Sequence, residues 1–186
     1  MGKFDIHNIQ DLNKLNNELD LEQANSLYSR LRPLAKDDPS IKSVRKHLAA
    51  LIKAYEEEHW SDDKAVTDEQ VKQSDYAEKL VAVQNDFIQA RKKLIRSKLK
   101  KYDLAQNDLA EILGHRKNYM SELINGARPF SKDDIVIIHR ILDIPLNKLV
   151  DRIIKENAAI RVRKVIARLN KPQLKLKDGD LNLELT

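Results

Sequence analysis

The sequence contains no cysteine and few glycine, proline or aromatic residues. Without cysteine there is no disulfide, no zinc–thiolate site and no thiol catalysis, and a reducing cytoplasmic compartment is expected. Only 4 glycines and 5 prolines occur among 186 residues, and aromatic residues make up 5%. Such a composition suits helices with leucine and isoleucine cores better than a turn-rich β-sandwich, so we expect a mainly α fold.

Long apolar runs are also missing. No run approaches the ~18 residues that a membrane span needs, and Met1–Ile6 lacks the apolar stretch of a secretion signal, so no membrane partner is expected. No glycine-rich phosphate loop, zinc-protease motif or nucleophile motif occurs. The acidic groups at 56–59 and 133–134 are typical of helix ends rather than of metal or catalytic clusters. We therefore expect no enzyme, no metal and no cofactor.

The two parts of the chain differ in charge. Residues 1–78 hold 11 Lys and Arg against 16 Asp and Glu, whereas residues 79–186 hold 23 against 13. The first part is therefore acidic and the second strongly basic, which suggests that only the second part faces a polyanion. The charge distribution alone is equally consistent with lysines and arginines that only keep helix surfaces in contact with water and bind no polyanion.

Two runs of apolar residues at helical spacing, Leu21–Leu34 and Ile41–Tyr55, predict two amphipathic helices. Between them, Asp37–Ser40 is a turn signal in which Pro39 is placed to open the second helix. We expect a helical hairpin within a partner-binding module over residues 1–60. Pro33 predicts a kink or an early end of the first helix, because proline inside a helix removes a hydrogen bond.

Further elements are predicted around this hairpin. Ile9, Leu12, Leu15 and Leu19 indicate a shorter helix before it. Residues 61–84 are polar and begin without periodicity, so we interpret them as a linker or a loosely packed helix. Residues 85–150 then form a second helical domain, whose first helix carries a basic outer face.

The last segment, residues 151–186, combines two patterns. A helical pattern runs to Pro172, and alternating apolar and polar residues then surround Asp178-Gly179, the sequence of a tight β-hairpin. We predict a C-terminal helix followed by a small β-hairpin. The hairpin places four leucines on one face, which is expected to pack on the body, a second subunit or another protein: Leu174, Leu176, Leu181 and Leu183.

The most informative stretch runs from Leu104 to Gly126. Two short helices that cross tightly need a small side chain where they touch, and Ala110 is suited to that position. The turn between them needs a residue that tolerates positive φ, which Gly114 supplies. Asn125-Gly126 then forms the stop of the second helix.

This packing predicts which side chains of the second helix point outward. They are Lys117, Asn118, Ser121 and Glu122. Lysine can donate to guanine, asparagine can form two hydrogen bonds with adenine, and glutamate can accept from cytosine. Serine can donate to or accept from a base edge. Gln106, at the start of the first helix, is placed to meet a phosphate.

Residues 104–150 resemble the Cro/repressor-type (XRE) helix-turn-helix domain, a five-helix fold that binds double-stranded DNA. The resemblance rests on the family pattern and on a capping box at Ser131–Asp134. It implies base contacts for Lys117, Asn118 and Glu122. It implies phosphate contacts for Gln106, Arg116 and Asn125, while Tyr119 is bulkier than the residue usual at its position. The full candidate DNA-binding set is Gln106, Arg116, Lys117, Asn118, Tyr119, Ser121, Glu122, Asn125 and Arg128.

The helical module and residues 48–59 also resemble the HigA antitoxin family. This resemblance implies a cytoplasmic, nucleoid-associated homodimer that represses its own operon and neutralises a HigB-like toxin bound through Glu56–Glu58. The first alternative is a stand-alone helix-turn-helix regulator without a toxin partner. The second alternative is a purely structural helical interaction module. Dimerisation through residues 151–186 is expected, because DNA-binding proteins of this type span two half-sites.

Overall fold

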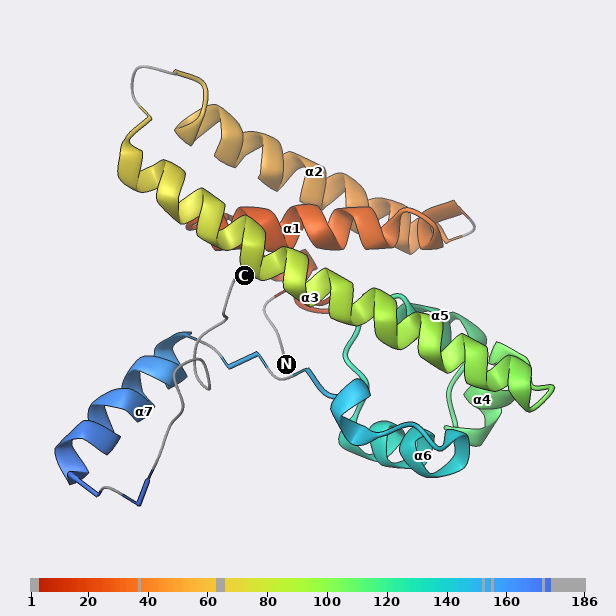
Figure 1. The fold of residues 1–186 in the computed structure, drawn as a ribbon. Helices are drawn as coiled ribbons and strands as arrows, with labels where there is room; N and C mark the ends of the chain where they lie inside the picture. The colour runs from red at the N-terminus through yellow and green to blue at the C-terminus, as the bar shows by residue number, and fades with distance from the viewer. Residues whose placement is uncertain are drawn as a thin grey trace. The chain divides into compact units, whose positions relative to one another are not determined.

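The computed structural model describes residues 4–36, 38–62, 66–151, 153–154, 156–171 and 173–174. These residues form seven α-helices and three 3₁₀ helices, and no strand occurs among them (Figure 1). The α-helices are α1 Glu18–Leu31, α2 Pro39–His59, α3 Asp68–Lys101, α4 Gln106–Ile112, α5 Lys117–Ile124, α6 Lys132–Leu142 and α7 Glu156–Leu169. The 3₁₀ helices are η1 Ile9–Asp11, η2 Leu34–Lys36 and η3 Leu146–Lys148. The chain divides into two compact units, Met1–Val150 and Asp151–Thr186. The prediction of a mainly α fold is confirmed.

The predicted helical hairpin is formed by α1 and α2, which pack against each other. Asp38 caps α2 by accepting hydrogen bonds from the Ser40 and Ile41 amides, and Pro39 occupies the first turn, where its missing N–H costs nothing. Helix α1 ends at Leu31, before Pro33. The predicted early end of this helix is therefore confirmed.

The short helix expected over residues 9–19 is reduced to the 3₁₀ turn η1. Asn17 accepts a hydrogen bond from the Asp20 amide at 2.9 Å, and Asp20 accepts one from the Asn16 amide at 3.0 Å. These bonds fix a helix start at Glu18, so the preceding residues are extended and that prediction was wrong. Leu15 is buried nevertheless, as part of the N-terminal core.

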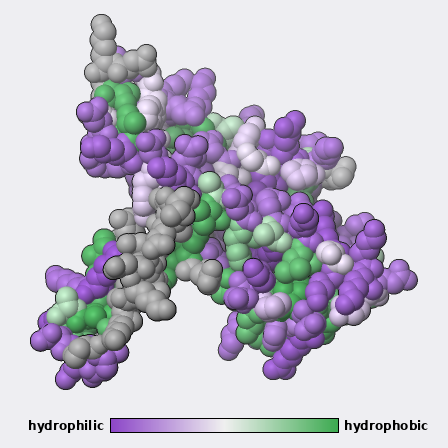
Figure 2. Space-filling view, viewed as in Figure 1, coloured by the Kyte–Doolittle hydropathy of each residue, from purple (hydrophilic) through white to green (hydrophobic). Residues whose placement is uncertain are grey.

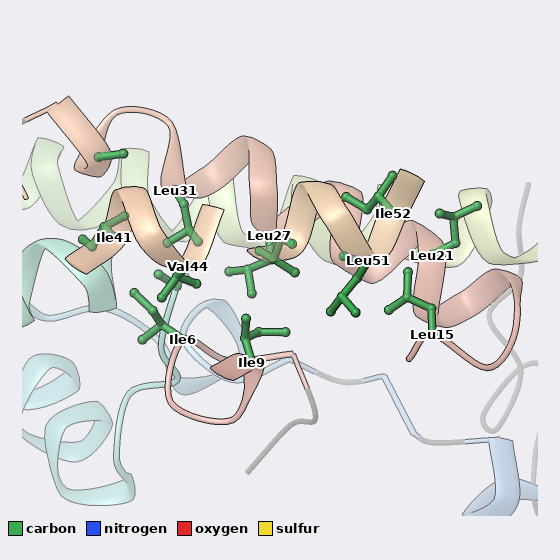
Figure 3. Close-up of a cluster of buried hydrophobic side chains, with 14 of the residues drawn as sticks. Ile6, Ile9, Leu15, Leu21, Leu27, Leu31, Ile41, Val44, Leu51 and Ile52 are labelled. Carbon is green, nitrogen blue, oxygen red and sulfur yellow. The ribbon is translucent and has the colours of Figure 1, made fainter. Parts of the chain in front are cut away.

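This core gathers apolar side chains from the N-terminal segment, α1 and α2, which point toward one another in Figure 3. Ala127, which follows α5 in the chain, is fully buried in the same cluster. The Ile6 amide donates to the Ala127 carbonyl at 3.2 Å. The N-terminal segment is therefore bonded to the loop after α5.

The segment 61–84, predicted as a linker or a loosely packed helix, is helical from Asp68 onward, where α3 begins. Thr67 caps it by accepting from the Gln70 amide, and from Asp68 the chain is helical to Lys101. Ala77, Leu80 and Val81 are buried in its first half, which packs along α1. The buried stripe is narrow and polar residues fill the rest of the surface, so the helical period was obscured in the sequence.

The second half of α3 contributes Ile95 and Leu99 to a second core, with side chains from α4, α5 and α6. Basic residues of α3 hold the end of this domain. Arg91 donates to the Leu149 carbonyl at 3.2 Å, and Lys98 donates to the Asp143 carbonyl at 2.8 Å. The basic outer face therefore does more than solvate the helix.

The second unit contains α7, which confirms a helix within residues 151–172. Two of its large apolar side chains are exposed, with Ile160 52% and Leu169 45% accessible. Figure 2 shows apolar and hydrophilic surface side by side on α7 (lower left). The predicted β-hairpin lies outside the described residues, apart from Gln173 and Leu174. In the described ranges, no helix has both the length and the apolar character required to cross a bilayer.

Candidate nucleic-acid interface

Helices α4 and α5 meet through a short turn, as the sequence predicts. Ala110, 3% exposed, lies within the core shared by α4 and α5, where a larger side chain would separate them. Gly114 has φ +70, in the left-handed region that favours glycine. The His115 amide donates to the Ala110 carbonyl at 2.8 Å and closes the turn. The predicted roles of Ala110 and Gly114 are confirmed.

The stop after α5 is more constrained than the turn before it. Gly126 has φ +72, and a Cβ atom there would lie 2.7 Å from Cγ2 of Ile88 on α3. Asn125 is the C-cap, and its side-chain amide donates to the Ser121 carbonyl at 2.8 Å. Both the backbone conformation and the lack of space therefore require glycine at position 126.

Three candidate residues form an exposed row where α5 begins: Arg116, Lys117 and Asn118. Arg116 is the N-cap, and its side chain makes no capping bond. Two of the row carry positive charge and the third carries an amide with both donors and an acceptor. This row can meet phosphates and base edges at the same time.

Gln106 and Ser121, which were predicted separately as a phosphate contact and a base contact, are bonded to each other. Gln106 Nε2 donates to Ser121 Oγ at 3.0 Å, and both side chains are half-buried. The bond ties the first turn of α4 to the middle of α5. It sets the spacing between the two helices, while each side chain retains further hydrogen-bonding capacity.

Glu122 does not point outward as predicted. It is 8% exposed, and its carboxylate accepts a short hydrogen bond from Nε of Arg128 in the following loop. Its backbone carbonyl also accepts from the Ala127 amide at 2.9 Å. A helix of 3.6 residues per turn rotates position 122 away from Lys117 and toward this loop, so the outward placement was wrong.

Residues 95–149 match a protein-family model described as helix-turn-helix. The matched segment is thus similar to helix-turn-helix domains, in agreement with the arrangement of α4, the turn and α5. The match covers the second half of α3 and all elements from α4 to η3. No curated protein and no solved structure matches the chain significantly.

Within the helix-turn-helix domain, Tyr119 is held between two side chains. Its ring lies 4.9 Å from that of His115, and the guanidinium of Arg128 lies 5.2 Å from its centroid. His115 in turn contacts Asp134 at 2.8 Å, beside the capping box of α6, which is formed as predicted. Tyr119 is 38% exposed, so part of its ring remains on the surface next to the exposed row.

Asn125 of the helix-turn-helix domain is 9% exposed and accepts a hydrogen bond from Lys92 Nζ at 2.7 Å. Burial, followed by the nearby charge of Arg96, lowers the pKa of Lys92. Sequence reasoning missed this pair because the two residues are far apart in the chain. The helical pattern around Lys92 and the helix stop at Asn125 contain no information on their contact. The Glu122–Arg128 pair had a local signal, opposite charges on either side of the Asn125-Gly126 stop.

The described residues contain no group of three or more histidine, aspartate and glutamate side chains arranged to hold a metal ion. The acidic end of α2 is partly paired. Glu58 accepts from Lys14 at 3.0 Å, and Glu57 lies 3.5 Å from Lys53.

Proposed function

We propose that this chain is a sequence-specific DNA-binding regulator that places α5 in the major groove of duplex DNA. One observation carries the proposal: a helix-turn-helix domain presents Arg116, Lys117 and Asn118 together on the exposed start of α5. The start of a recognition helix is the part that reaches base edges in this class of protein.

The exposed row divides by chemistry. Lys117 suits guanine and Asn118 suits adenine, because their donors and acceptors match those base edges in the major groove. Arg116 precedes the helix and suits a phosphate, which fixes register without reading sequence. Gln106 and Ser121 hold the two helices together and offer their remaining groups to the DNA.

The buried members of the candidate set act indirectly in this proposal. Glu122 and Arg128 neutralise each other and fix the loop after α5. Arg128 also supports the ring of Tyr119. Asn125 meets the DNA backbone through its partner Lys92 rather than by itself.

Titration of the full chain against an operator duplex and a scrambled duplex at several salt concentrations tests this division. Replacing Lys117 or Asn118 by Ala should cost about 1–3 kcal/mol on the operator and relax the preference at particular base positions. Replacing Arg116 by Ala should weaken binding to both duplexes and reduce the salt slope by about one, because one phosphate contact is lost.

Asn147→Ala and Lys148→Ala are matched controls, since they make the same chemical changes at exposed positions in η3, outside α4 and α5. They should leave the ratio of operator to scrambled binding unchanged. If Lys117→Ala and Asn118→Ala also leave that ratio unchanged, α5 does not read the sequence and the proposal fails.

We further propose an antitoxin role in which residues 1–60 bind a basic toxin, with a stand-alone regulator as the alternative. The acidic first part of the chain supports it, although Glu57 and Glu58 already face lysines of this chain. Charge reversal of exposed Glu56 and Glu57 to Lys in the full chain should abolish co-purification of the adjacent gene's product. Absence of co-purification with the wild-type chain would favour the stand-alone regulator, and retention by the doubly reversed chain would place the toxin contact away from Glu56 and Glu57.

A homodimer completes the proposal, because one recognition helix covers only a few base pairs and a second half-site lies about one helical turn away. The exposed apolar side chains of the second unit are the candidate contact, among them Ile154, Ile160 and Leu169.

A further inference from the structure

A cavity of about 480 Å³ lies between α1 and α3 and reaches Asn125 at the end of α5. A volume of this size is in the range of small-molecule sites. Most of its lining residues are polar, and the charged ones are segregated along both helices. Glu22 and Glu78 line one end, and Arg30 and Lys92 line the other.

Arg30 is the central side chain of the basic end. Its Nη1 donates to Ser26 Oγ at 3.0 Å and to Asn85 Oδ1 at 2.9 Å. Its Nε is buried and makes no hydrogen bond. In the described ranges no carboxylate pairs with this guanidinium, although buried charges are ordinarily paired.

Neighbouring charges increase this imbalance. Burial, followed by the charge of Arg91, lowers the pKa of Arg30 to about 10. The ammonium of Lys92, which lines the same end, donates to a neutral amide oxygen, that of Asn125. Among the residues that the structure describes, the basic end therefore concentrates positive charge without a paired carboxylate, in a cavity large enough to admit an anion.

The acidic end determines how a ligand would lie. Glu22 and Arg30 are two turns apart on α1, about 12 Å at the helical rise. Burial, followed by Glu78 and Glu18, raises the pKa of Glu22, so a second anionic group would be repelled at that end. The ligand that fits carries its negative charge at one end only.

We propose that the basic end of this cavity binds the oxyanion group of a small polar metabolite. Nη2 of the Arg30 guanidinium receives the oxyanion, because Nη1 is already occupied and the buried Nε is not reached from the cavity. Lys92 supplies the second charge, and the side-chain amides of Asn85 and Asn125 remain beside it.

Inorganic phosphate and acetate are the probes, titrated into the full chain without DNA and compared with chloride at equal ionic strength. The side-chain resonances of Arg30 Nε–H, Asn85 and Asn125 should shift with a saturable dependence on at least one probe. The two probes distinguish a tetrahedral from a planar oxyanion. Shifts that follow ionic strength alone, for both probes, would overturn the proposal.

Variants locate the site. Arg30→Gln should weaken probe binding at least tenfold, measured on the Asn85 and Asn125 resonances. Arg32→Gln, the same change at an exposed position two residues on, should leave it unchanged. If Arg30→Gln fails to fold, Lys92→Gln is the deciding variant. At least threefold weaker probe binding by Lys92→Gln supports the site, and unchanged probe binding overturns the proposal. Loss of binding in Arg116→Ala instead would place the anion on the DNA-facing row and also overturn it.

One consequence rests on the proposed function. Because Lys92 holds the C-cap residue Asn125, an anion that attracts Lys92 weakens this bond at the end of α5. The better-binding probe should therefore change operator affinity in the wild type and not in Lys92→Gln. Anion binding is measured without DNA, so a chain that binds the anion but no duplex contradicts the proposed function alone.

Discussion

Gly114 and Gly126 share one backbone conformation but have different surroundings. Their φ values are +70 and +72, yet a Cβ atom at Gly114 meets nothing within 4 Å, whereas at Gly126 it meets Ile88 on α3. The turn between α4 and α5 therefore needs glycine for conformation alone. The stop after α5 needs it for space as well.

Alanine substitutions should separate these two requirements. Gly114→Ala should lower the free energy of unfolding by about 1–2 kcal/mol, the cost of a left-handed conformation for a residue with a Cβ. Gly126→Ala should cost more, because the contact with Ile88 is added. Urea unfolding of both variants checks this. In a double-mutant cycle Ile88→Ala should recover part of the extra loss, and strict additivity would contradict the steric account.

Glu22 offers a test by pH. Burial, then the charges of Glu78 and Glu18, raise its pKa above the ordinary 4.5, so the ionised carboxyl is less favourable in the folded state. Glu22→Gln should therefore raise the free energy of unfolding at pH 7, by about 0.2–1 kcal/mol for a group this exposed. This gain in stability should shrink as pH falls through the raised pKa of Glu22. It should vanish below the pKa of Glu22 in the unfolded chain, where the carboxyl is neutral in both the folded and the unfolded state.

Urea unfolding from pH 3.5 to 7.5 gives this profile, with Asp86→Asn as a control at an exposed position on α3. A gain from Glu22→Gln that is constant with pH would show that the carboxylate charge is not its cause.

At the scale of elements, α3 belongs to both cores of the first unit. Its first half buries Leu80 and Val81 against α1, and its second half buries Ile95 and Leu99 within the helix-turn-helix domain. Figure 1 shows the same continuous helix running from beside α1 toward α4 and α5. This continuous helix joins the two cores, together with the contacts that Ala127 makes in the N-terminal core.

Breaking α3 in its exposed middle should uncouple the two cores. Asp86→Pro removes one backbone hydrogen bond and clashes with the preceding turn, at about 3 kcal/mol or more. Unfolding followed by the fluorescence of Trp60, the single tryptophan, should then separate from unfolding of the helix-turn-helix domain followed by the Met120 methyl resonance. In the wild type and in Asp86→Ala the two transitions should coincide; coincidence in Asp86→Pro would mean that other contacts couple the cores.

At the scale of the whole molecule, the two units differ in how they bury apolar surface. The first unit has two cores of its own, whereas the second exposes Ile154, Ile160, Leu169 and Leu174 by 42–52% each. Exposed aliphatic side chains gathered on one short segment are typical of a surface that is covered by a partner. A second copy of the chain is the partner that DNA binding favours.

Truncation should decide whether this unit holds a dimer together. Removal of residues 151–186 leaves the compact first unit and should yield monomers at micromolar concentration, measured by sedimentation equilibrium. Removal of residues 172–186 alone tests the predicted leucine face and is also expected to yield monomers. A truncated chain that remains dimeric moves the contact into residues 1–150.

The local features could be predicted from the sequence alone. The turn at Ala110 and Gly114, the capping box at Ser131 and the end of α1 before Pro33 follow from steric and hydrogen-bonding preferences of residues close together in the chain. Much of the helix-turn-helix pattern consists of such local requirements, which is why the sequence alone indicated it over residues 104–150.

The remaining features depend on contacts between segments that are distant in the chain. Helix α3 was obscured over residues 68–84 because its buried stripe is defined by α1, a distant segment. Glu122 turned inward because Arg128 lies in the loop that packs beside it, and Asn125 was buried by Lys92. The unpaired charge of Arg30 likewise arises only where α1 and α3 come together. In each case the deciding partner is brought close by packing, which residue spacing along the chain does not encode.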